Sequence, residues 1–123
     1  MNTVLWIIQI LLALAFLMAG VLKMTQPIEK LSVQMGWVKD FQPNIVRLIG
    51  LVELLGAIGL ILPALTGILP ILTPLAAVGL VITMIGAVYT HLRRSENSHL
   101  IGPIVLGILA LIVVYGRFVA VPL

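Results

Sequence analysis

The chain has 123 residues, of which 62% are hydrophobic and 9% are charged, and its formal net charge is +3. A soluble domain carries about 25% charged residues, so we expect this chain to lie mostly within a bilayer. Cysteine is absent, which excludes disulfides, thiol redox chemistry and cysteine-ligated metal or iron–sulfur centres. The seven lysines and arginines form no basic stripe, so nucleic-acid binding is not expected.

Four apolar segments have the length that a membrane-spanning helix needs, which is about 20 residues. We predict spanning helices over residues 4–22, 45–62, 74–92 and 99–119. The predicted fold class is therefore all-α: an integral membrane four-helix bundle that forms one transmembrane domain over residues 1–123.

The first apolar segment has an alternative interpretation as a secretory signal peptide, because it ends in small residues near Ala19 and Gly20. However, residues 1–3 carry no basic side chain, and the apolar run is longer than the usual stretch of about 7–15 residues. A spanning helix is therefore favoured.

A stretch of mixed polarity, residues 27–41, follows the first helix. Apolar side chains recur at helical spacing between Ile28 and Met35, opposite polar ones. We predict a short helix that lies in the membrane interface, with Trp37 and Phe41 at the level of the lipid headgroups.

Prolines indicate where the second predicted helix ends and where the third begins. We expect an uncharged turn over residues 63–70. Thr73 then suits the cap of the third helix, and Pro74 suits its first turn. A short polar turn over residues 93–98 leads into the fourth helix.

The charges are distributed unequally between the two sides of the predicted bundle. Four spans place six of the seven basic residues on the side of the first and third loops: Lys23, Lys30, Lys39, Arg47, Arg93 and Arg94. On the other side we expect Arg117 and Tyr115 to extend towards the interface. Positive charge is retained in the cytoplasm, so in a bacterial-type inner membrane loops 1 and 3 are expected to be cytoplasmic and both termini external.

Small and polar residues repeat at spacings of three and four in each predicted helix, which lets membrane helices approach closely. The expected contact positions are Gln9, Ala13, Phe16, Gly20 and Lys23, then Val46, Gly50, Glu53, Ala57 and Leu60, then Ala76, Gly79, Thr83, Gly86 and Thr90, and finally Gly107, Ala110, Val114 and Arg117. A repeat near 3.5 residues indicates a left-handed bundle.

One acid, Glu53, lies inside the second predicted helix, in the run RLIGLVELLGAIGLIL. A carboxylate near the middle of a span costs about 2.5–3.5 kcal/mol to insert, which the surrounding aliphatic residues only roughly offset. We therefore expect Glu53 to face the bundle interior and to find a partner there.

Other polar residues are expected near Glu53 or on the helix faces that meet it. The candidate ligand-binding or proton-relay residues are Glu53, His91, Lys23, Arg47, Tyr89 and Gln9. Two interpretations stay open: an ion pair of Glu53 with Lys23 or Arg47 that only fixes helix packing, or a polar cavity in which Glu53 and His91 bind or relay something.

The sequence contains no complete metal or catalytic set. His91 and Glu53 are two scattered ligands, and His99 is expected at a surface turn, so no metal site is predicted. Haem is not expected either, because no second axial histidine lies at matching depth. The only aspartate, Asp40, is placed on a surface loop, which excludes a Ser-His-Asp triad. We predict no catalytic residue.

Four stretches of sequence, in order over roughly residues 12–96, carry a family resemblance: FLMAGVLKM, MGWVKDFQP, RLIGLVELLGAIGLILPAL and AAVGLVITMIGAVYTHLRRSE. They resemble the DoxX-like membrane protein family. The resemblance implies a four-helix integral membrane protein in which Lys23, Arg47, Glu53 and His91 match the polar pattern of the family. Relatives have been linked to thiosulfate–quinone oxidoreductase systems, to oxidative-stress complexes and, in animals, to receptor assembly in the secretory pathway.

Three functions stay open at this point. The first is an accessory protein that holds a small apolar ligand such as a quinone, or a partner protein, at a polar pocket around Glu53. The second is a subunit of a quinone-linked oxidoreductase, for which a partner would supply the redox centre. The third is a small proton-coupled exporter, although small multidrug transporters place their glutamate in the first helix. Membrane lipid is an expected partner in each case, and a membrane protein partner or a homo-oligomer is left open.

Overall fold

In the computed structural model of the protein, residues 2–122 are described, apart from the side chain of Gln34. Over this range the chain is helical throughout, with short connections. The elements are α1 (Asn2–Thr25), α2 (Ile28–Gln34), the 3-10 turn η1 (Gly36–Asp40), α3 (Pro43–Thr66), α4 (Leu72–Arg93), the 3-10 turn η2 (Asn97–His99), α5 (Ile101–Tyr115) and the π-helical turn η3 (Gly116–Ala120).

Among the described residues, four helical segments are long and apolar enough to cross a membrane: Asn2–Thr25, Pro43–Thr66, Leu72–Arg93 and Asn97–Ala120. The predicted fold class, an all-α membrane bundle of four spans, is confirmed. Aliphatic side chains are exposed along each span, as in Leu14, Ile58, Ile85 and Ile108. Such an outer surface fits contact with lipid, because helices satisfy their backbone hydrogen bonds internally.

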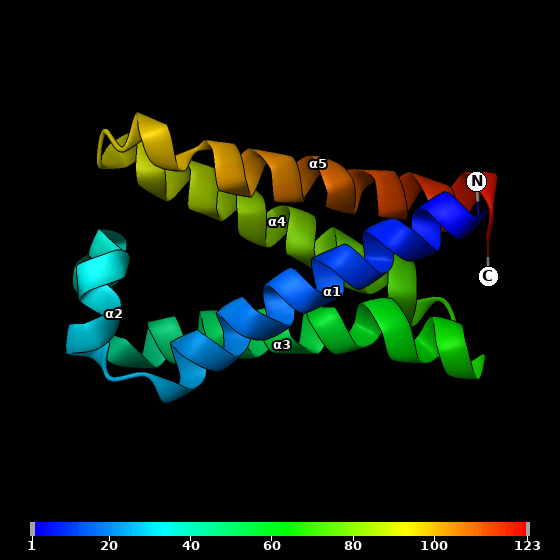
Figure 1. Cartoon of the computed structure of the whole chain (residues 1–123), viewed down its shortest axis with the longest axis horizontal. Coiled ribbons are helices and arrows are strands. Elements are labelled where there is room, and N and C mark those ends of the chain that lie inside the picture. Colours follow the sequence, from blue (N-terminus) through cyan, green and yellow to red (C-terminus); the bar gives the residue numbers. More distant parts are fainter. Residues whose placement is uncertain (1, 123) are drawn as a thin grey trace.

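The four long helices lie along one axis, and both chain termini lie at the same end (Figure 1). α1 packs mainly against α3, α3 also packs against α4, and α4 packs against α5, whereas α1 and α5 share a much smaller contact. Figure 1 shows that α1 and α5 converge near the termini and diverge towards α2. The bundle is therefore closed at one end and open at the other.

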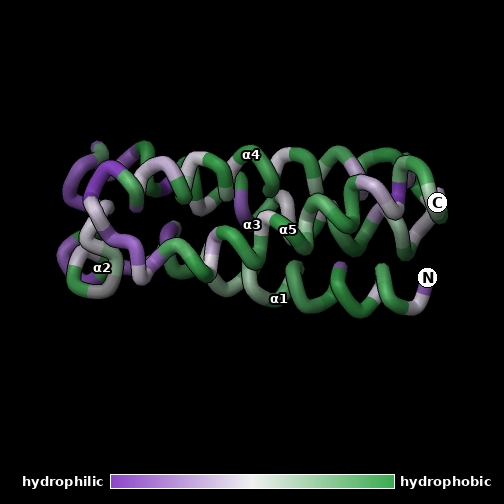
Figure 2. The backbone as a smooth tube through the Cα atoms, turned by 90° about the horizontal axis from the view of Figure 1, so that it is seen from above, coloured by the Kyte–Doolittle hydropathy of each residue, from purple (hydrophilic) through white to green (hydrophobic). Residues whose placement is uncertain are grey.

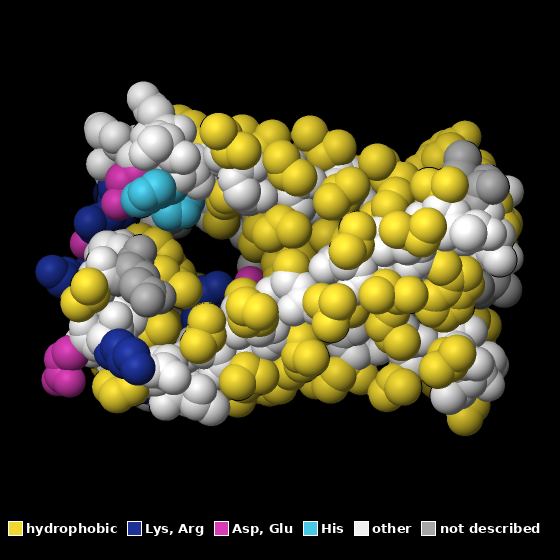
Figure 3. Space-filling view, in the orientation of Figure 1, with side chains coloured by type: hydrophobic (Ala, Val, Ile, Leu, Met, Phe, Trp, Pro, Cys, Tyr) yellow, Lys and Arg dark blue, Asp and Glu magenta, His cyan; other side chains and the backbone are white. Residues whose placement is uncertain are grey.

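The two ends of the bundle differ in polarity. Hydrophilic residues gather at the end that contains α2 and η2, and the rest of the tube is mostly hydrophobic (Figure 2). We call this the basic end and define it as residues 23–42 and 91–100. The opposite end, with both termini, is the terminal end. Figure 3 shows lysines, arginines, acids and histidines together at the basic end.

α3 continues beyond its predicted end at residue 62 and passes through Pro63 to Thr66. Proline lacks the N–H that would bond the carbonyl of Gly59, and the Thr73 hydroxyl of α4 donates to that carbonyl instead, at 2.9 Å. α3 ends where Gly67 adopts a left-handed φ of 73°. Thr73 is therefore not the predicted cap of its helix, because α4 already begins at Leu72.

The predicted contact positions hold for α1 and α3 and fail for α4. In α1, Gln9, Phe16, Gly20 and Lys23 are buried, and all five expected positions of α3 are buried. In α4 the buried positions are Thr73, Pro74, Ala77, Leu80 and Met84, one face away from the small residues expected there. The core face of α4 combines two large side chains, Leu80 and Met84, with the smaller Ala77, and the large ones bury the most apolar surface. Its small residues are left along another face.

Two glycines set the close approach of α1 and α3. A Cβ atom on Gly20 would lie 2.7 Å from the carbonyl oxygen of Gly50, and one on Gly50 would lie 2.8 Å from the Cβ atom of Lys23. Real Cβ atoms do not come this close to a backbone, so the crossing requires glycine at both positions. The same crossing brings Lys23 against α3.

Arg117 was expected to extend to the outer interface, and this prediction is wrong. Its exposed fraction is 2%. Its Nε donates to Gln9 Oε1 at 2.7 Å and its Nη1 to Asn2 Oδ1 at 2.8 Å, and its guanidinium lies 5.7 Å from the ring of Trp6. The convergence of α1 and α5 at the terminal end supplies these partners, so the cation stays inside. Tyr115, by contrast, is exposed.

We expect Gly20→Ala to destabilise the bundle by about 1–3 kcal/mol, because the added methyl group meets the backbone of α3. Gly79→Ala is the matched control, because a Cβ atom at Gly79 meets nothing within 4 Å. Thermal unfolding in detergent measures both. Equal melting temperatures for the two variants would contradict the close approach of α1 and α3.

We expect Thr73→Val to lower the free energy of unfolding by about 1–2 kcal/mol, because the Gly59 carbonyl freed by Pro63 loses its donor inside the bundle. The control is Thr90→Val, which removes a hydroxyl that donates to the Gly86 carbonyl of the same helix. That carbonyl keeps its backbone donor, so the loss should be smaller. Unfolding in detergent by chemical denaturant compares the two. A larger loss in the control would argue against the role given to Thr73.

Candidate ligand-binding cavity

A cavity of about 890 Å³ lies between the two halves of the bundle at the basic end. α1, η1, α3, α4 and the start of α5 all contribute to its lining, which is mostly apolar. In the space-filling view the molecule is hollowed here, and basic and acidic side chains are visible inside (Figure 3). The side chains that carry polar atoms into the lining are Lys23, Trp37, Asp40, Glu53, Thr83, Tyr89, Thr90, His91, Arg93 and Arg94.

The cavity exists because α1 and α5 separate and because α4 presents small side chains to the space between them. Gly86 and Ala87 of α4 and Gly102 of α5 line it, and a Cβ atom on Gly86 or Gly102 would meet nothing within 4 Å. The small face of α4 was expected to form a tight helix contact. Where it meets no opposing helix, it leaves open volume.

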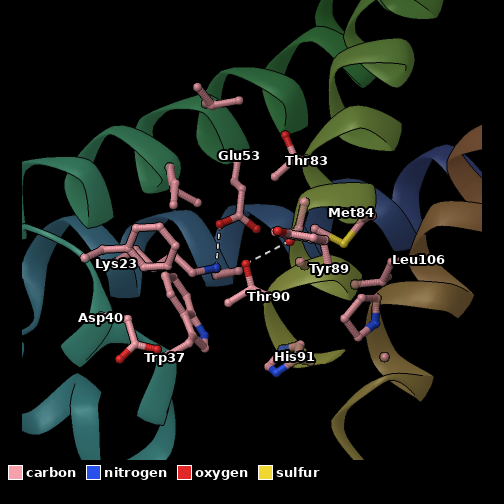
Figure 4. Close-up of a pocket in the computed structure, with 18 of the residues that line it drawn as sticks. Lys23, Trp37, Asp40, Glu53, Thr83, Met84, Tyr89, Thr90, His91 and Leu106 are labelled. Carbon is pink, nitrogen blue, oxygen red and sulfur yellow. Dashed lines mark hydrogen bonds and ion pairs between the residues drawn. The ribbon is translucent and has the colours of Figure 1, made fainter. Parts of the chain in front are cut away.

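Glu53 forms an ion pair with Lys23 across the α1–α3 crossing. Lys23 Nζ donates to Glu53 Oε1 at 2.5 Å, and the two side chains are 11% and 2% exposed. Figure 4 shows the pair in the cavity wall, between α3 and the segment that carries Trp37. The inward orientation expected for Glu53 is found, and the partner is Lys23.

Arg47 lies nearby but makes a different contact. Its Nη1 donates to the backbone carbonyl oxygen of Lys23 at 2.6 Å. This bond satisfies a carbonyl in the last turn of α1, where helices have unpaired acceptors. Arg47 therefore fixes the end of the helix that carries Lys23, and no bond between Arg47 and Glu53 is found among the described residues.

Aromatic side chains close the cavity towards the basic end. The rings of Trp37 and Phe41 are packed edge to face with centroids 5.7 Å apart, and Lys23 Nζ lies 5.8 Å from the Trp37 ring. Both rings are held by a small core in which Leu31 and Val38 are buried. The amphipathic pattern of the sequence predicted only that these rings lie at the level of the lipid headgroups. The contact of Trp37 with Lys23 depends on how α2 and η1 fold back over the bundle.

His91 lines the same cavity as Glu53, but its bonded partner is Glu96. His91 Nδ1 lies 3.0 Å from Glu96 Oε1. Tyr89 also lines the cavity and is mostly exposed, with the Arg93 guanidinium 5.9 Å from its ring. Figure 4 shows Tyr89 beside the ion pair and His91 below it.

Gln9 does not belong to this site. It is fully buried nearer the terminal end, where its Nε2 donates to the Leu60 carbonyl at 2.7 Å and its Oε1 accepts from Arg117. It shares a face of α1 with Lys23, as the sequence indicated, but it lies about four turns away along that helix.

A salt bridge outside the spans joins the two halves of the bundle. Arg94 Nη1 lies 2.5 Å from Asp40 Oδ2, and Arg94 Nε lies 3.3 Å from Glu96 Oε1. The hydrogen bond to Asp40 raises the pKa of Arg94, and bonds from His91 and Arg94 lower the pKa of Glu96. This contact could not be predicted from the sequence, because Asp40 and Arg94 are separated by 54 positions with no shared periodicity.

A model of the DoxX-like family matches residues 7–113, which include every residue that lines the cavity. The chain belongs to the DoxX-like family. No curated protein and no solved structure matched the chain. The family match agrees with the resemblance seen in the sequence, and with the four spans of the structure.

In this DoxX-like protein the site combines three chemical properties. The ion pair offers a strong donor in Lys23 and an acceptor in Glu53, and the Trp37 ring presents a flat apolar face beside them. The rest of the lining is mostly apolar, with further polar side chains among its residues. Such a site can bind a molecule that has a polar head and an apolar body, because pockets of this kind orient ligands with a few polar groups in an apolar lining.

For the DoxX-like protein we expect Glu53→Ala to lower the free energy of unfolding by about 3–5 kcal/mol, because it leaves the Lys23 ammonium buried without a partner. The double variant Lys23→Met with Glu53→Leu removes both charges and is expected to recover most of that loss. Denaturant unfolding in detergent of Lys23→Met, of Glu53→Leu and of the double variant measures the coupling. Additive effects would show that the pair does not interact.

Proposed function

We propose that this protein binds a lipid-soluble molecule with a flat, hydrogen-bonding head, of the quinone class, in the cavity at the basic end. The observation that carries the proposal is the position of the Lys23–Glu53 pair in the wall of a largely apolar cavity. A pair that served only helix packing would be enclosed between α1 and α3. Here both residues also border open volume.

The size of the cavity supports this class of ligand. Ligand pockets usually hold about 300–1,000 Å³, and a volume of about 890 Å³ falls in that range. A quinone head offers carbonyl oxygens, to which the Lys23 ammonium can donate, and a planar ring, which can pack on Trp37. A quinone head is uncharged and needs no counter-charge from the protein. This suits the Lys23–Glu53 pair, whose net charge is zero.

The opening of the cavity supports entry from the bilayer. α1 and α5 diverge towards the basic end, and the hollow in Figure 3 lies between them. The two helices that flank the gap carry exposed apolar side chains, among them Leu14 and Met18 on α1 and Ile104 and Ile108 on α5. An apolar tail can therefore remain in lipid while the head occupies the cavity.

The charge distribution supports an orientation. Lys30, Lys39, Arg93 and Arg94 all belong to the basic end, whereas the terminal end holds Arg117, which is buried. By the positive-inside rule we propose that the basic end faces the cytoplasm of a bacterial-type inner membrane and that both termini are external. The ligand head would then be bound in the cytoplasmic half of the bilayer.

The same site is compatible with a role as a subunit of a quinone-linked oxidoreductase. In that case the chain would bind the quinone, and a membrane protein partner would contribute the electron-transfer centre. Binding alone requires only residues of this chain. A change in quinol oxidation by cell membranes on deletion of the gene would extend it to the oxidoreductase role.

Binding can be measured through Trp37, because the chain has only two tryptophans and Trp6 lies at the terminal end. In a Trp6→Phe background, a short-chain ubiquinone analogue should quench Trp37 fluorescence saturably in detergent. Gly86→Leu should weaken the affinity at least tenfold, about 1.4 kcal/mol, because it fills the cavity. Gly79→Leu, on the same helix but outside the lining, should leave binding unchanged.

Glu53→Gln tests the role of the charge in the same assay, because it keeps the shape of the side chain. The expected result is a folded protein with weaker quenching, since the Lys23 ammonium then lacks its fixed counter-charge. Quenching that does not saturate, or that is equal in the Gly86→Leu and Gly79→Leu variants, would refute binding in this cavity.

A further inference from the structure

The two histidines of the chain meet at the basic end, each near the end of a membrane-crossing segment. His91 lies in the last turn of α4 and His99 ends η2. Between them the chain turns back, and the Glu96 N–H bonds the His91 carbonyl at 2.9 Å. This turn places the Glu96 carboxylate between both imidazoles. The cluster therefore gathers both histidines of the protein and one of its four acids.

The spacing within this cluster is close to that of metal ligands. His91 Nδ1 lies 3.0 Å from Glu96 Oε1, and His99 Nδ1 lies 3.8 Å from Glu96 Oε2. One ligand atom from each residue lies within 4.8 Å of the other two. Ligands about 2.0–2.2 Å from a tetrahedral metal ion are separated by about 3.4 Å, so small side-chain rotations would bring all three into place.

We propose that His91, Glu96 and His99 bind one divalent transition-metal ion of the Zn²⁺ type. Two imidazoles and one carboxylate are a ligand set that zinc takes in proteins when a fourth position is left for water or substrate. Carboxylate with imidazole suits Zn²⁺ better than Ca²⁺ or Mg²⁺, which prefer oxygen ligands alone. This site is separate from the ion pair and does not depend on the ligand proposed for the large cavity.

A second, smaller hollow supplies room for the fourth ligand. It measures about 370 Å³ and is lined by both histidines together with Met35, Gly36 and Trp37. His91 also borders the large cavity. An ion held by the cluster would therefore face open space that a water molecule can enter, rather than a filled protein core.

Arg94 is the positioning residue of this site. Its Nε lies 3.3 Å from Glu96 Oε1, which leaves Oε2, the oxygen nearer His99, free to turn to an ion. The positive charge of Arg94 would oppose a metal ion, but Asp40 lies 2.5 Å from its Nη1 and offsets that charge. Partners that orient a ligating carboxylate in this way usually affect metal affinity.

The test uses the full-length protein in detergent without a polyhistidine tag, stripped of metal by EDTA and then dialysed. Zn²⁺ is titrated in competition with a chromogenic chelator, and Co²⁺ replaces it to report coordination by visible absorption. We expect one ion per chain. His99→Ala should weaken Zn²⁺ binding by at least about tenfold, and Arg94→Gln by about 10–100-fold.

His99→Ala is the decisive variant, because its side chain is 56% exposed and its loss should not disturb folding. Glu29→Gln removes an exposed acid of α2 outside the cluster and is the matched control, with unchanged affinity expected. Zn²⁺ uptake that does not saturate at one per chain, or an affinity that is equal in wild type and His99→Ala, would overturn the proposal. Loss of binding in His99→Ala with retention in Glu29→Gln would support it.

Discussion

The ion pair between Lys23 and Glu53 is the interaction on which the rest of the structure depends. A single charged side chain within a membrane span costs free energy of insertion. Lys23 and Glu53 reduce this cost for each other, because their charged atoms lie 2.5 Å apart. The pair forms only because Gly20 and Gly50 let α1 and α3 cross at backbone contact. Arg47 adds a bond to the end of α1 that keeps Lys23 in place. The ion pair therefore depends on the close packing of α1 and α3.

The two ends of the bundle use buried polar groups in opposite ways. At the terminal end, Arg117 and Gln9 bond each other and join α1 to η3, the turn that follows α5. At the basic end, these helices separate, and the Lys23–Glu53 pair borders a cavity instead of a closed interface. Membrane helices gain little from apolar contact with each other compared with lipid, so polar bonds and small residues decide where they touch. The cavity is located where α1 and α5 lack such bonds.

The loops at the basic end make further polar contacts next to the cavity. The salt bridge of Arg94 with Asp40 connects η1 to the loop after α4, and both residues line the cavity. The same arginine contacts Glu96, which lies between His91 and His99. A ligand in the cavity and an ion at the histidines would therefore contact neighbouring parts of one polar surface. Coupling between them would pass through Arg94 and His91.

The sequence by itself determined the class, the four spans, the inward direction of Glu53 and the faces of α1 and α3, because insertion cost and helical periodicity act locally along the chain. Only the tertiary structure decided three other features: the core face of α4, the burial of Arg117, and the partner of His91. Each depends on which helices meet and where they diverge. Periodicity marks the positions that share a face, but it does not say whether a neighbour, a cavity or lipid will cover that face.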